Sequence, residues 1–172
     1  DGVDRVYEHG GNDTIRFGAG IASSDIQFLR HPDSPESDDL EIVIKGTDDK
    51  ITVKNYFVDY TRVNQKNDGA VERFEFSDGT VLTTQDVIDQ VRIRHGSDGD
   101  NCLSGLSDVE NILYGDAGND ELFGSGGNDT LIGGRDDDAL YGGCGDDVYI
   151  FNKGDGVDRV YEHGGNDTIR FG

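Results

Sequence analysis

The chain has 172 residues, of which 33% are hydrophobic, and this fraction is too low for a large conventional core. Acidic residues number 36 against 15 basic ones, so the formal net charge is −21 and a compact state repels itself unless cations bind. Nucleic acid and anionic membranes are therefore poor partners, whereas cations are good ones.

The first eighteen residues, DGVDRVYEHGGNDTIRFG at 1–18, return unchanged at 155–172. The period is 155 − 1 = 154 residues, and identity over this length indicates a parent protein built of tandem units. We therefore interpret 1–18 as the end of a preceding repeat block and the chain as an excised fragment. It contains no signal peptide and no apolar run of membrane-spanning length.

Residues 19–95 contain few glycines and show alternating apolar positions at 40–44, 51–53 and 74–76, which is the pattern of β-strands. Asp78-Gly79 predicts a hairpin turn after Phe76, because glycine accepts the positive φ of a tight turn. The polar stretches 30–39 and 59–69 have no periodicity and are expected to be loops.

The segment TTQDVIDQVRIR predicts a short helix. Thr83 and Asp86 have the spacing of a capping box, and Val87, Ile88 and Val91 fall on one helical face.

From Gly115 the chain is organised in nine-residue rows: GDAGNDELF, GSGGNDTLI, GGRDDDALY and GGCGDDVYI. Each row has aspartate at its sixth place and an apolar residue at its eighth. Degenerate rows precede them at 96–104 and 105–114, with Asn101 and Asn111 at the sixth place. Two more rows follow a two-residue insertion at 151–152 and carry Asp158 and Asp167.

Such a row divides into a six-residue turn and a three-residue strand, so two rows complete one coil of a flattened superhelix. Rows eighteen residues apart then stack, and Asp120 faces Asp138 while Asp129 faces Asp147. Carboxylates with inward carbonyls form an all-oxygen cage, which favours Ca²⁺ over the smaller Mg²⁺. Transition metals prefer histidine or cysteine, which the turns do not offer as a set; Cys102 and Cys144 are read as free thiols.

These rows, above all GSGGNDTLI at 124–132, resemble the RTX (repeats-in-toxin) family of haemolysin-type calcium-binding repeats. The stretch FEFSDGTVL gives residues 19–95 a looser resemblance to the haemolysin-type calcium-binding-related domain. The resemblance implies an all-β fold: a parallel β-roll at 96–172 and a small strand-rich domain with one short helix at 19–95.

The resemblance also implies a ligand set for each pair of stacked rows, made of two carbonyls and the sixth-place side chain from each row. Carried over, the two best sets are Asp116, Gly118 and Asp120 with Gly133, Arg135 and Asp138, and Ser125, Gly127 and Asp129 with Gly142, Cys144 and Asp147. Further sets are Ser97, Gly99 and Asn101 with Gly115, Ala117 and Asp120; Gly134, Asp136 and Asp138 with Lys153, Asp155 and Asp158; and Gly143, Gly145 and Asp147 with Glu162, Gly164 and Asp167. Asp4 and Asp13 lack partner rows, so we expect them to bind weakly or not at all.

The expected function is that of a calcium-binding module of a large secreted bacterial toxin or adhesin that folds on several Ca²⁺ ions after type I secretion. The implied location is extracellular, with cell-surface association as a variant, and the implied partners are neighbouring tandem units and the secretion machinery. We do not expect an enzyme, because no HExxH or GxSxG motif occurs. An alternative is a module that recognises a host surface or glycan through residues 19–95, with the roll as a rigid spacer. For the metal-free chain, disorder is the alternative to a fold.

Overall fold

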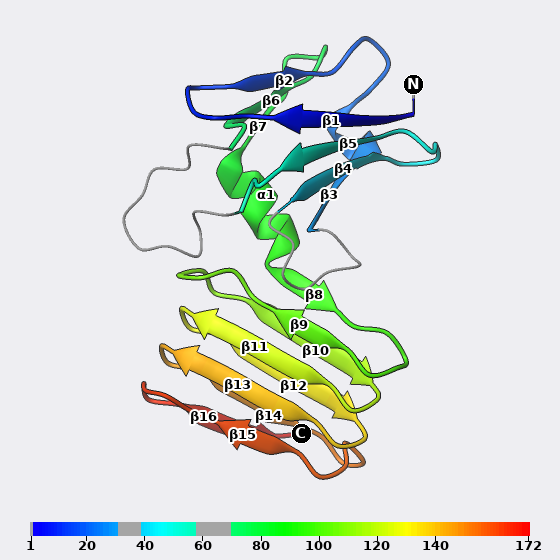
Figure 1. The fold of residues 1–172 in the computed structure, drawn as a ribbon. Helices are drawn as coiled ribbons and strands as arrows, with labels where there is room; N and C mark the ends of the chain where they lie inside the picture. The colour runs from blue at the N-terminus through cyan, green and yellow to red at the C-terminus, as the bar shows by residue number, and fades with distance from the viewer. Residues whose placement is uncertain (1, 31–38, 58–69) are drawn as a thin grey trace. The chain divides into compact units, whose positions relative to one another are not determined.

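The structure is a computed structural model that describes residues 2–30, 39–57 and 70–172 (Figure 1). Contacts between Cα atoms divide the chain into two units, Asp1–Val91 and Arg92–Gly172. The loops expected at 30–39 and 59–69 lie almost wholly outside the described residues. Among the described residues, no helix has the length and apolar character needed to cross a membrane.

Over the residues described, the first unit has two sheets, one short 3₁₀ helix and one α-helix. The four-stranded sheet has the order β1-β5-β4-β3, and the three-stranded sheet has the order β2-β6-β7. The elements are β1 (Val3–Tyr7), β2 (Thr14–Arg16), η1 (Ser23–Asp25), β3 (Ile26–Arg30), β4 (Leu40–Ile44), β5 (Lys50–Lys54), β6 (Arg73–Glu75), β7 (Val81–Thr83) and α1 (Thr84–Val91).

The strands predicted from alternation are present, and their apolar positions form the core of this unit. Leu40, Ile42 and Val53 are fully buried, and Phe28 packs edge-on against Phe74 with ring centroids 4.9 Å apart. The antiparallel pairing of β3 with β4 was not anticipated, although Ile26 and Phe28 alternate with Gln27. Because that alternation covers a few positions only, the sequence signal is weak.

The predicted hairpin and helix are also confirmed. Gly79 has φ +89° between the antiparallel strands β6 and β7. The Asp86 carboxylate accepts hydrogen bonds from both the amide and the hydroxyl of Thr83, at 2.7 Å each, as at a capped helix start. The helix buries Val87, Ile88 and Val91 and ends there, because the next residues enter a strand of the second unit.

Residues 1–18 contribute one strand to each sheet of the first unit. β1 pairs in parallel with β5 from Val3 opposite Lys50, and β2 pairs in parallel with β6 from Thr14 opposite Arg73. After β2, the ring of Phe17 stacks on Phe76 at 4.7 Å.

The second unit is a parallel solenoid, drawn in Figure 1 as two layers of stacked strands. One sheet has the order β16-β14-β12-β10-β8 and the other β15-β13-β11-β9, and every pairing is parallel. The strands are β8 (Ile93–His95), β9 (Cys102–Ser104), β10 (Ile112–Ala117), β11 (Glu121–Gly126), β12 (Thr130–Arg135), β13 (Ala139–Cys144), β14 (Val148–Phe151), β15 (Arg159–Tyr161) and β16 (Thr168–Phe171).

The register of this solenoid follows the repeat. Leu113 lies opposite Leu131 and Leu122 opposite Leu140, each eighteen residues apart, whereas across the insertion Leu140 lies opposite Val160. The eighth-place side chains form one buried file between the sheets: Leu103, Leu113, Leu122, Leu131, Leu140 and Tyr149. The predicted fold class, a parallel β-roll with a small strand-rich unit containing one short helix, is therefore confirmed.

Candidate metal centre

A file of buried aspartates runs along the turns of the roll. Asp120, Asp129, Asp138 and Asp147 are each at most 1% exposed, although an isolated charged carboxylate is rarely buried. They occupy the sixth place of the four regular rows, at the point where each turn enters its strand. The sequence placed them in the turns, and the structure shows that these turns have no access to water at that place.

One oxygen of each of these carboxylates is bound by the protein. The amide of Asp120 donates to Oδ1 of Asp138 at 2.8 Å, and the amide of Asp129 donates to Oδ1 of Asp147 at 2.7 Å. The same bond crosses the insertion, from Asp138 to Asp158 at 2.9 Å. The predicted facing of aspartates eighteen residues apart is thus present in the hydrogen-bond pattern.

The other oxygen, Oδ2, is buried without a hydrogen-bond donor in all four residues: Asp120, Asp129, Asp138 and Asp147. Its surroundings offer further acceptors. A Cβ placed on Gly115 would collide both with Oδ2 of Asp120 and with the carbonyl oxygen of Gly133, so these two oxygens converge on one point. Around Gly124, Oδ2 of Asp129 and the carbonyl of Gly142 converge in the same way. At these two places the protein supplies no donor to Oδ2, so a bound cation would compensate the converging acceptors.

The pKa values of the buried aspartates agree with this need. Burial, assisted by Asp147 and Glu110, raises the pKa of Asp129 to about 7, and burial, assisted by Asp158 and Asp120, raises the pKa of Asp138 to about 6. The pKa values of Asp120, Asp147 and Asp158 are also raised, in each case first by burial.

Strand pairing stacks the rows from which the two best ligand sets were predicted. Asp116 pairs with Gly134 and Ala117 with Arg135 on one edge of the roll. Ser125 pairs with Gly143 on the other edge, as Gly126 does with Cys144. Arg135, Cys144 and Lys153 have side chains that are not oxygen ligands, so their part in a site is limited to the carbonyl.

The rows of the outer sets also lie close together. In the first, the amide of Ala117 donates to the carbonyl of Ser97 at 3.4 Å, and Gly118 lies against Gly99 so closely that a Cβ would collide. In the set that spans the insertion, Gly156 lies equally close to the carbonyl of Asp136. There the carboxylate of Asp155 accepts a hydrogen bond from the amide of Asn152, so its side chain is engaged within its own turn.

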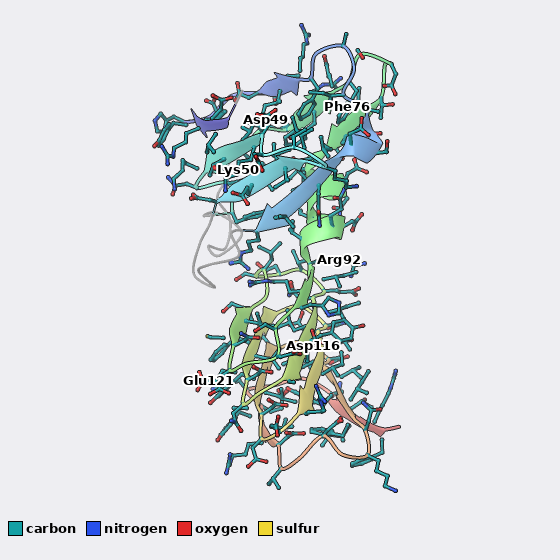
Figure 2. All side chains as sticks on the ribbon, turned by 90° about the vertical axis from the view of Figure 1, so that its right-hand side faces the viewer. Asp49, Lys50, Phe76, Arg92, Asp116 and Glu121 are labelled. Atoms are coloured by element: carbon teal, nitrogen blue, oxygen red, sulfur yellow. The ribbon has the colours of Figure 1, made fainter. Side chains whose placement is uncertain are left out.

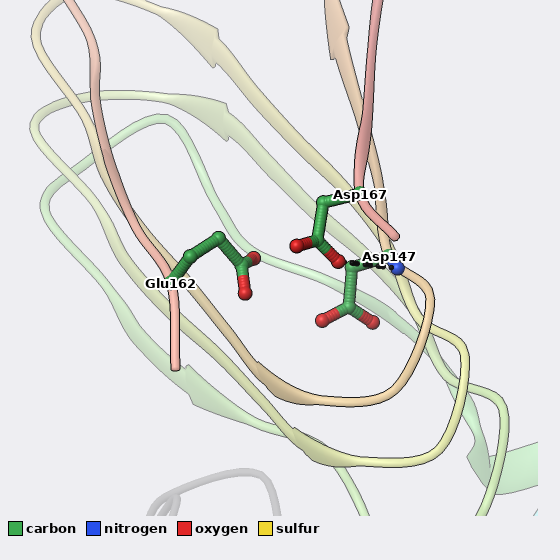
Figure 3. Close-up of side chains that lie close together, drawn as sticks. All are labelled: Asp147, Glu162 and Asp167. Carbon is green, nitrogen blue, oxygen red and sulfur yellow. Dashed lines mark hydrogen bonds between the residues drawn. The ribbon is translucent and has the colours of Figure 1, made fainter. Parts of the chain in front are cut away.

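At the last coil, three carboxylates converge (Figure 3). Oxygens of Asp147, Glu162 and Asp167 all lie within 4.8 Å of one another, and Asp147 is the buried member. The sequence reasoning assigned Glu162 through its carbonyl and missed its side chain, which also accepts a hydrogen bond from the hydroxyl of Tyr149. The available signal was glutamate at the first place of its row, where the four regular rows have glycine.

The row at 105–114 satisfies its oxygens differently. The side-chain nitrogen of Asn111 lies 2.9 Å from the carbonyl oxygen of Leu106, 2.7 Å from that of Val109, 3.2 Å from that of Gly124 and 2.8 Å from Oδ1 of Asp129. An amide NH₂ therefore fills an oxygen-lined space of the kind that a cation would fill. Asn111 belongs to none of the predicted ligand sets.

A second ladder runs along the fifth place of the rows and was also missed. The carboxylate of Asp100 accepts from the amide of Asn119 at 2.8 Å, and the side chain of Asn119 accepts from Asp137 at 3.2 Å. On the other edge, Asn128 accepts from Asp146 at 2.9 Å. Asparagine or aspartate recurs at this place, but a six-residue turn rich in such residues does not tell which of them bond to the neighbouring coil.

In the first eighteen residues, Asp4 and Asp13 lie on or beside the strands that pair with the strand-rich unit. Oδ2 of Asp13 is buried without a donor, and burial together with Glu8 and Glu72 raises the pKa of Asp13. Cys102 and Cys144 form no disulfide among the described residues, and both are exposed.

Stacked coils with a buried, donor-free carboxylate file define a calcium-binding parallel β-roll. The comparisons agree: residues 114–149 and 123–158 match the family described as RTX calcium-binding nonapeptide repeat, and residues 39–86 match the haemolysin-type calcium binding protein related domain. The rows of the roll are therefore RTX calcium-binding nonapeptide repeats, and the ion of their turns is Ca²⁺, the hard cation that an all-oxygen site prefers.

One solved structure that is similar to this chain is the extracellular lipase LipA from Serratia marcescens, with a TM-score of 0.42 and 18% sequence identity. The match covers 99% of this chain and 26% of the lipase, so the chain spans about a quarter of that protein. No curated protein sequence matches the chain.

Proposed function

We propose that this calcium-binding module belongs to a large secreted bacterial protein, a toxin or an adhesin, and that Ca²⁺ drives the folding of its roll after type I secretion. The observation that supports this proposal is the file of buried Oδ2 atoms that face acceptors. Without a cation, each coil that stacks adds another uncompensated carboxylate to the interior.

The proposed sequence of events follows from linkage between binding and folding. At low calcium, a net charge of −21 and the buried aspartates oppose the stacking of coils, so the chain stays extended and fit for export. Outside the cell, calcium at about millimolar concentration fills sites whose Kd is on the order of 10⁻⁴–10⁻³ M. Because the cage exists only between stacked turns, binding energy becomes folding energy.

The proposed ligands are the five sets of carbonyls and sixth-place side chains derived from the rows, with the carboxylate of Glu162 added at the last coil. The proposed partners, besides calcium, are neighbouring tandem units and the type I secretion machinery. The repeats supply structure and ion binding, and we propose no catalytic role for them.

The alternative of a recognition module requires an exposed aromatic or apolar patch on residues 19–95. Within the described part of this range, the exposed large hydrophobic residues are Val81 at 38% and Ile93 at 43%. Two residues without a shared strand do not make such a patch, so no observation on the described residues favours this alternative.

The test is a calcium titration followed by far-ultraviolet circular dichroism, with Asp129 and Asp147 both changed to alanine. We expect the double variant to need at least about tenfold more calcium for its folding transition, because one carboxylate pair and its buried charge are removed together. A titration with Mg²⁺ is expected to give no transition in the same concentration range.

The matched control changes two exposed acidic residues of the same unit, Asp98 and Glu121, to alanine (Glu121 is labelled in Figure 2). It alters the net charge by the same amount but leaves the buried file intact. If this control shifts the calcium midpoint as much as the double variant does, general charge repulsion explains the folding and our ligand assignment is wrong.

A further inference from the structure

The two identical segments, 1–18 and 155–172, lie in complementary surroundings. In the first copy the strands pair with the strand-rich unit, and in the second copy the same strands pair with the roll. The aromatic residue that ends the segment shows the difference most clearly: Phe17 is 7% exposed, whereas Phe171 is 83% exposed.

The tyrosine of the segment shows the opposite trend. Tyr161 stacks on Tyr141 of the roll at 4.5 Å and is 41% exposed, whereas Tyr7, its counterpart, is 63% exposed. One edge of the segment therefore fits the preceding coil of a roll, and the other edge fits the strand-rich unit. Each copy in this chain uses one of its two edges.

The strand-rich unit binds the first copy as a further coil of the roll would. Within the roll, the amide of Thr168 donates to the carbonyl of Asp147 at 2.8 Å; in the first unit, the amide of Arg73 donates to the carbonyl of Asp13 at 3.2 Å. Both sheets of the segment are continued in parallel, by β5 beside β1 and by β6 beside β2. Lys50 and Phe76, labelled in Figure 2, lie at the first residue of β5 and directly after β6.

The aspartate ladder is continued as well. In the roll, the amide of Asp147 donates to Oδ1 of Asp167 in the next coil at 3.0 Å. Asp13 is the counterpart of Asp167, and its amide donates to Oε2 of Glu72 at 2.7 Å. The carboxylate of Glu72 therefore occupies the place of the next sixth-place aspartate.

At the other end of the chain, the matching edge is open. β15 and β16 are edge strands of their sheets. Val157, Ile169 and Phe171 are 65%, 51% and 83% exposed, and all three line a hollow of about 610 Å³ at the end of the coil. The amide of Gly172 donates to the carbonyl of Phe151 in the neighbouring strand. Because successive amides of a strand point to opposite sides, the amide of Phe171 faces the free edge of the sheet. Its counterpart Phe17 donates to the carbonyl of Glu75 at 2.9 Å.

We propose that the surface formed by residues 155–172 is the docking site for a second copy of residues 19–91, so that successive units join into one continuous two-sheet stack. The second copy binds through its β5 and β6, with Phe171 on the second Phe76 and Asp167 beside the second Glu72. The joint shares Asp167 with the last proposed ligand set, but its contacts are strand edges and aromatic packing, so it is tested in saturating calcium.

The test extends the full chain by a second copy of residues 19–91, joined so that Gly172 precedes Ala19 as Gly18 does in the chain. In saturating calcium, amide hydrogen exchange at Phe171 is expected to slow by at least about tenfold relative to the unextended chain. The control chain carries the appended domain behind a flexible linker and with its own copy of residues 1–18. In this control, the strand edges of the appended domain already pair with its own copy of residues 1–18. Amide exchange at Phe171 is therefore expected to stay fast.

Alanine variants give a second readout. Phe171→Ala leaves the melting temperature of the unextended chain unchanged, whereas in the extended chain it lowers that of the appended domain by about 10 °C. Phe17→Ala, which removes the matching contact of the first unit, should cause a similar shift in the unextended chain. The proposal is overturned if exchange at Phe171 is the same in the extended and control chains, or if the appended domain folds equally well with Phe171→Ala. Failure of the appended domain to fold behind residues 155–172 also overturns it.

Discussion

A side-chain amide fills an oxygen-lined space in the first coil of the roll. Asn111 uses its side-chain nitrogen to contact three carbonyls and the carboxylate of Asp129, while its own oxygen accepts from the amide of Leu106 at 2.8 Å. The row at 105–114 therefore offers an amide donor to buried oxygens where the regular rows have a carboxylate.

We expect Asn111→Asp to lower the free energy of unfolding by about 2 kcal/mol at low calcium, because it leaves buried acceptors without a donor. The loss should shrink as calcium rises, because the new carboxylate completes an oxygen set. Asn111→Ala loses the same donor but gains no ligand, so its loss should remain. Urea unfolding at two calcium concentrations measures both, and equal losses for the two variants at both concentrations would contradict this role.

The buried aspartates also predict a dependence on pH in the absence of calcium. In the folded roll the pKa of Asp129 is about 7 and that of Asp138 about 6, against an ordinary value of 3.8. Between about pH 4 and pH 7 the folded form thus holds more protons than the unfolded form, so the free energy of unfolding decreases as pH rises. Protons compete with calcium for these oxygens, and the calcium midpoint should increase as pH falls below 7.

Urea unfolding in a chelator at pH 5, 6 and 7.5 checks the first part of this prediction, and calcium titrations at the same pH values check the second. Asp129→Asn is the control, because it removes the group with the highest pKa of the file. A calcium-free roll that becomes more stable as pH rises from 5 to 7.5 would have the opposite sign and would refute the assignment.

At the scale of the turn, glycine is required for two separate reasons. Gly134 has φ +109°, and a Cβ there would collide with the backbone of Asp116 in the preceding coil. Gly154 has a similar φ of +102°, but a Cβ there would meet nothing within 4 Å. The two positions therefore separate backbone strain from the close approach of coils.

We expect Gly154→Ala to cost about 1 kcal/mol through strain alone. Gly134→Ala should cost on the order of 3 kcal/mol, because the coils must also move apart. Chemical unfolding in saturating calcium measures the difference. Equal losses would show that coil spacing does not depend on the missing side chain.

The regular rows were predictable because each row repeats both its turn chemistry and its inward residue. The nine-residue period alone assigns Leu122, Leu131 and Leu140 to the interior, and it also brings Asp120 opposite Asp138. Contacts that depend on the residues of a second row could not be predicted from the nine-residue pattern of one row. The amide contacts of Asn111, the side chain of Glu162 and the pairing of β8 with β10 all depend on residues in another row.

At the scale of the molecule, the two units have different reasons to be stable. The first unit has a compact core that includes Phe28, Phe74 and Val87, whereas the second has a single file of eighth-place residues and a buried row of charges. We expect a chelator to abolish amide protection in β11 to β13 while protection in α1 and β4 persists. Hydrogen exchange with mass spectrometry measures both regions in one sample, and a simultaneous loss would show that the first unit also depends on calcium.

The ten-residue row and the two-residue insertion have a consequence for the register in which the coils stack. Identical nonapeptides could slide by one full coil and still match leucine with leucine and aspartate with aspartate, so a perfectly periodic sequence has no unique alignment. The ten-residue row at 105–114 and the extra pair Phe151 and Asn152 bracket the regular rows. A slipped alignment would place one of these irregularities against a regular row and lose ladder hydrogen bonds there. The two irregularities therefore specify the correct register of the coils.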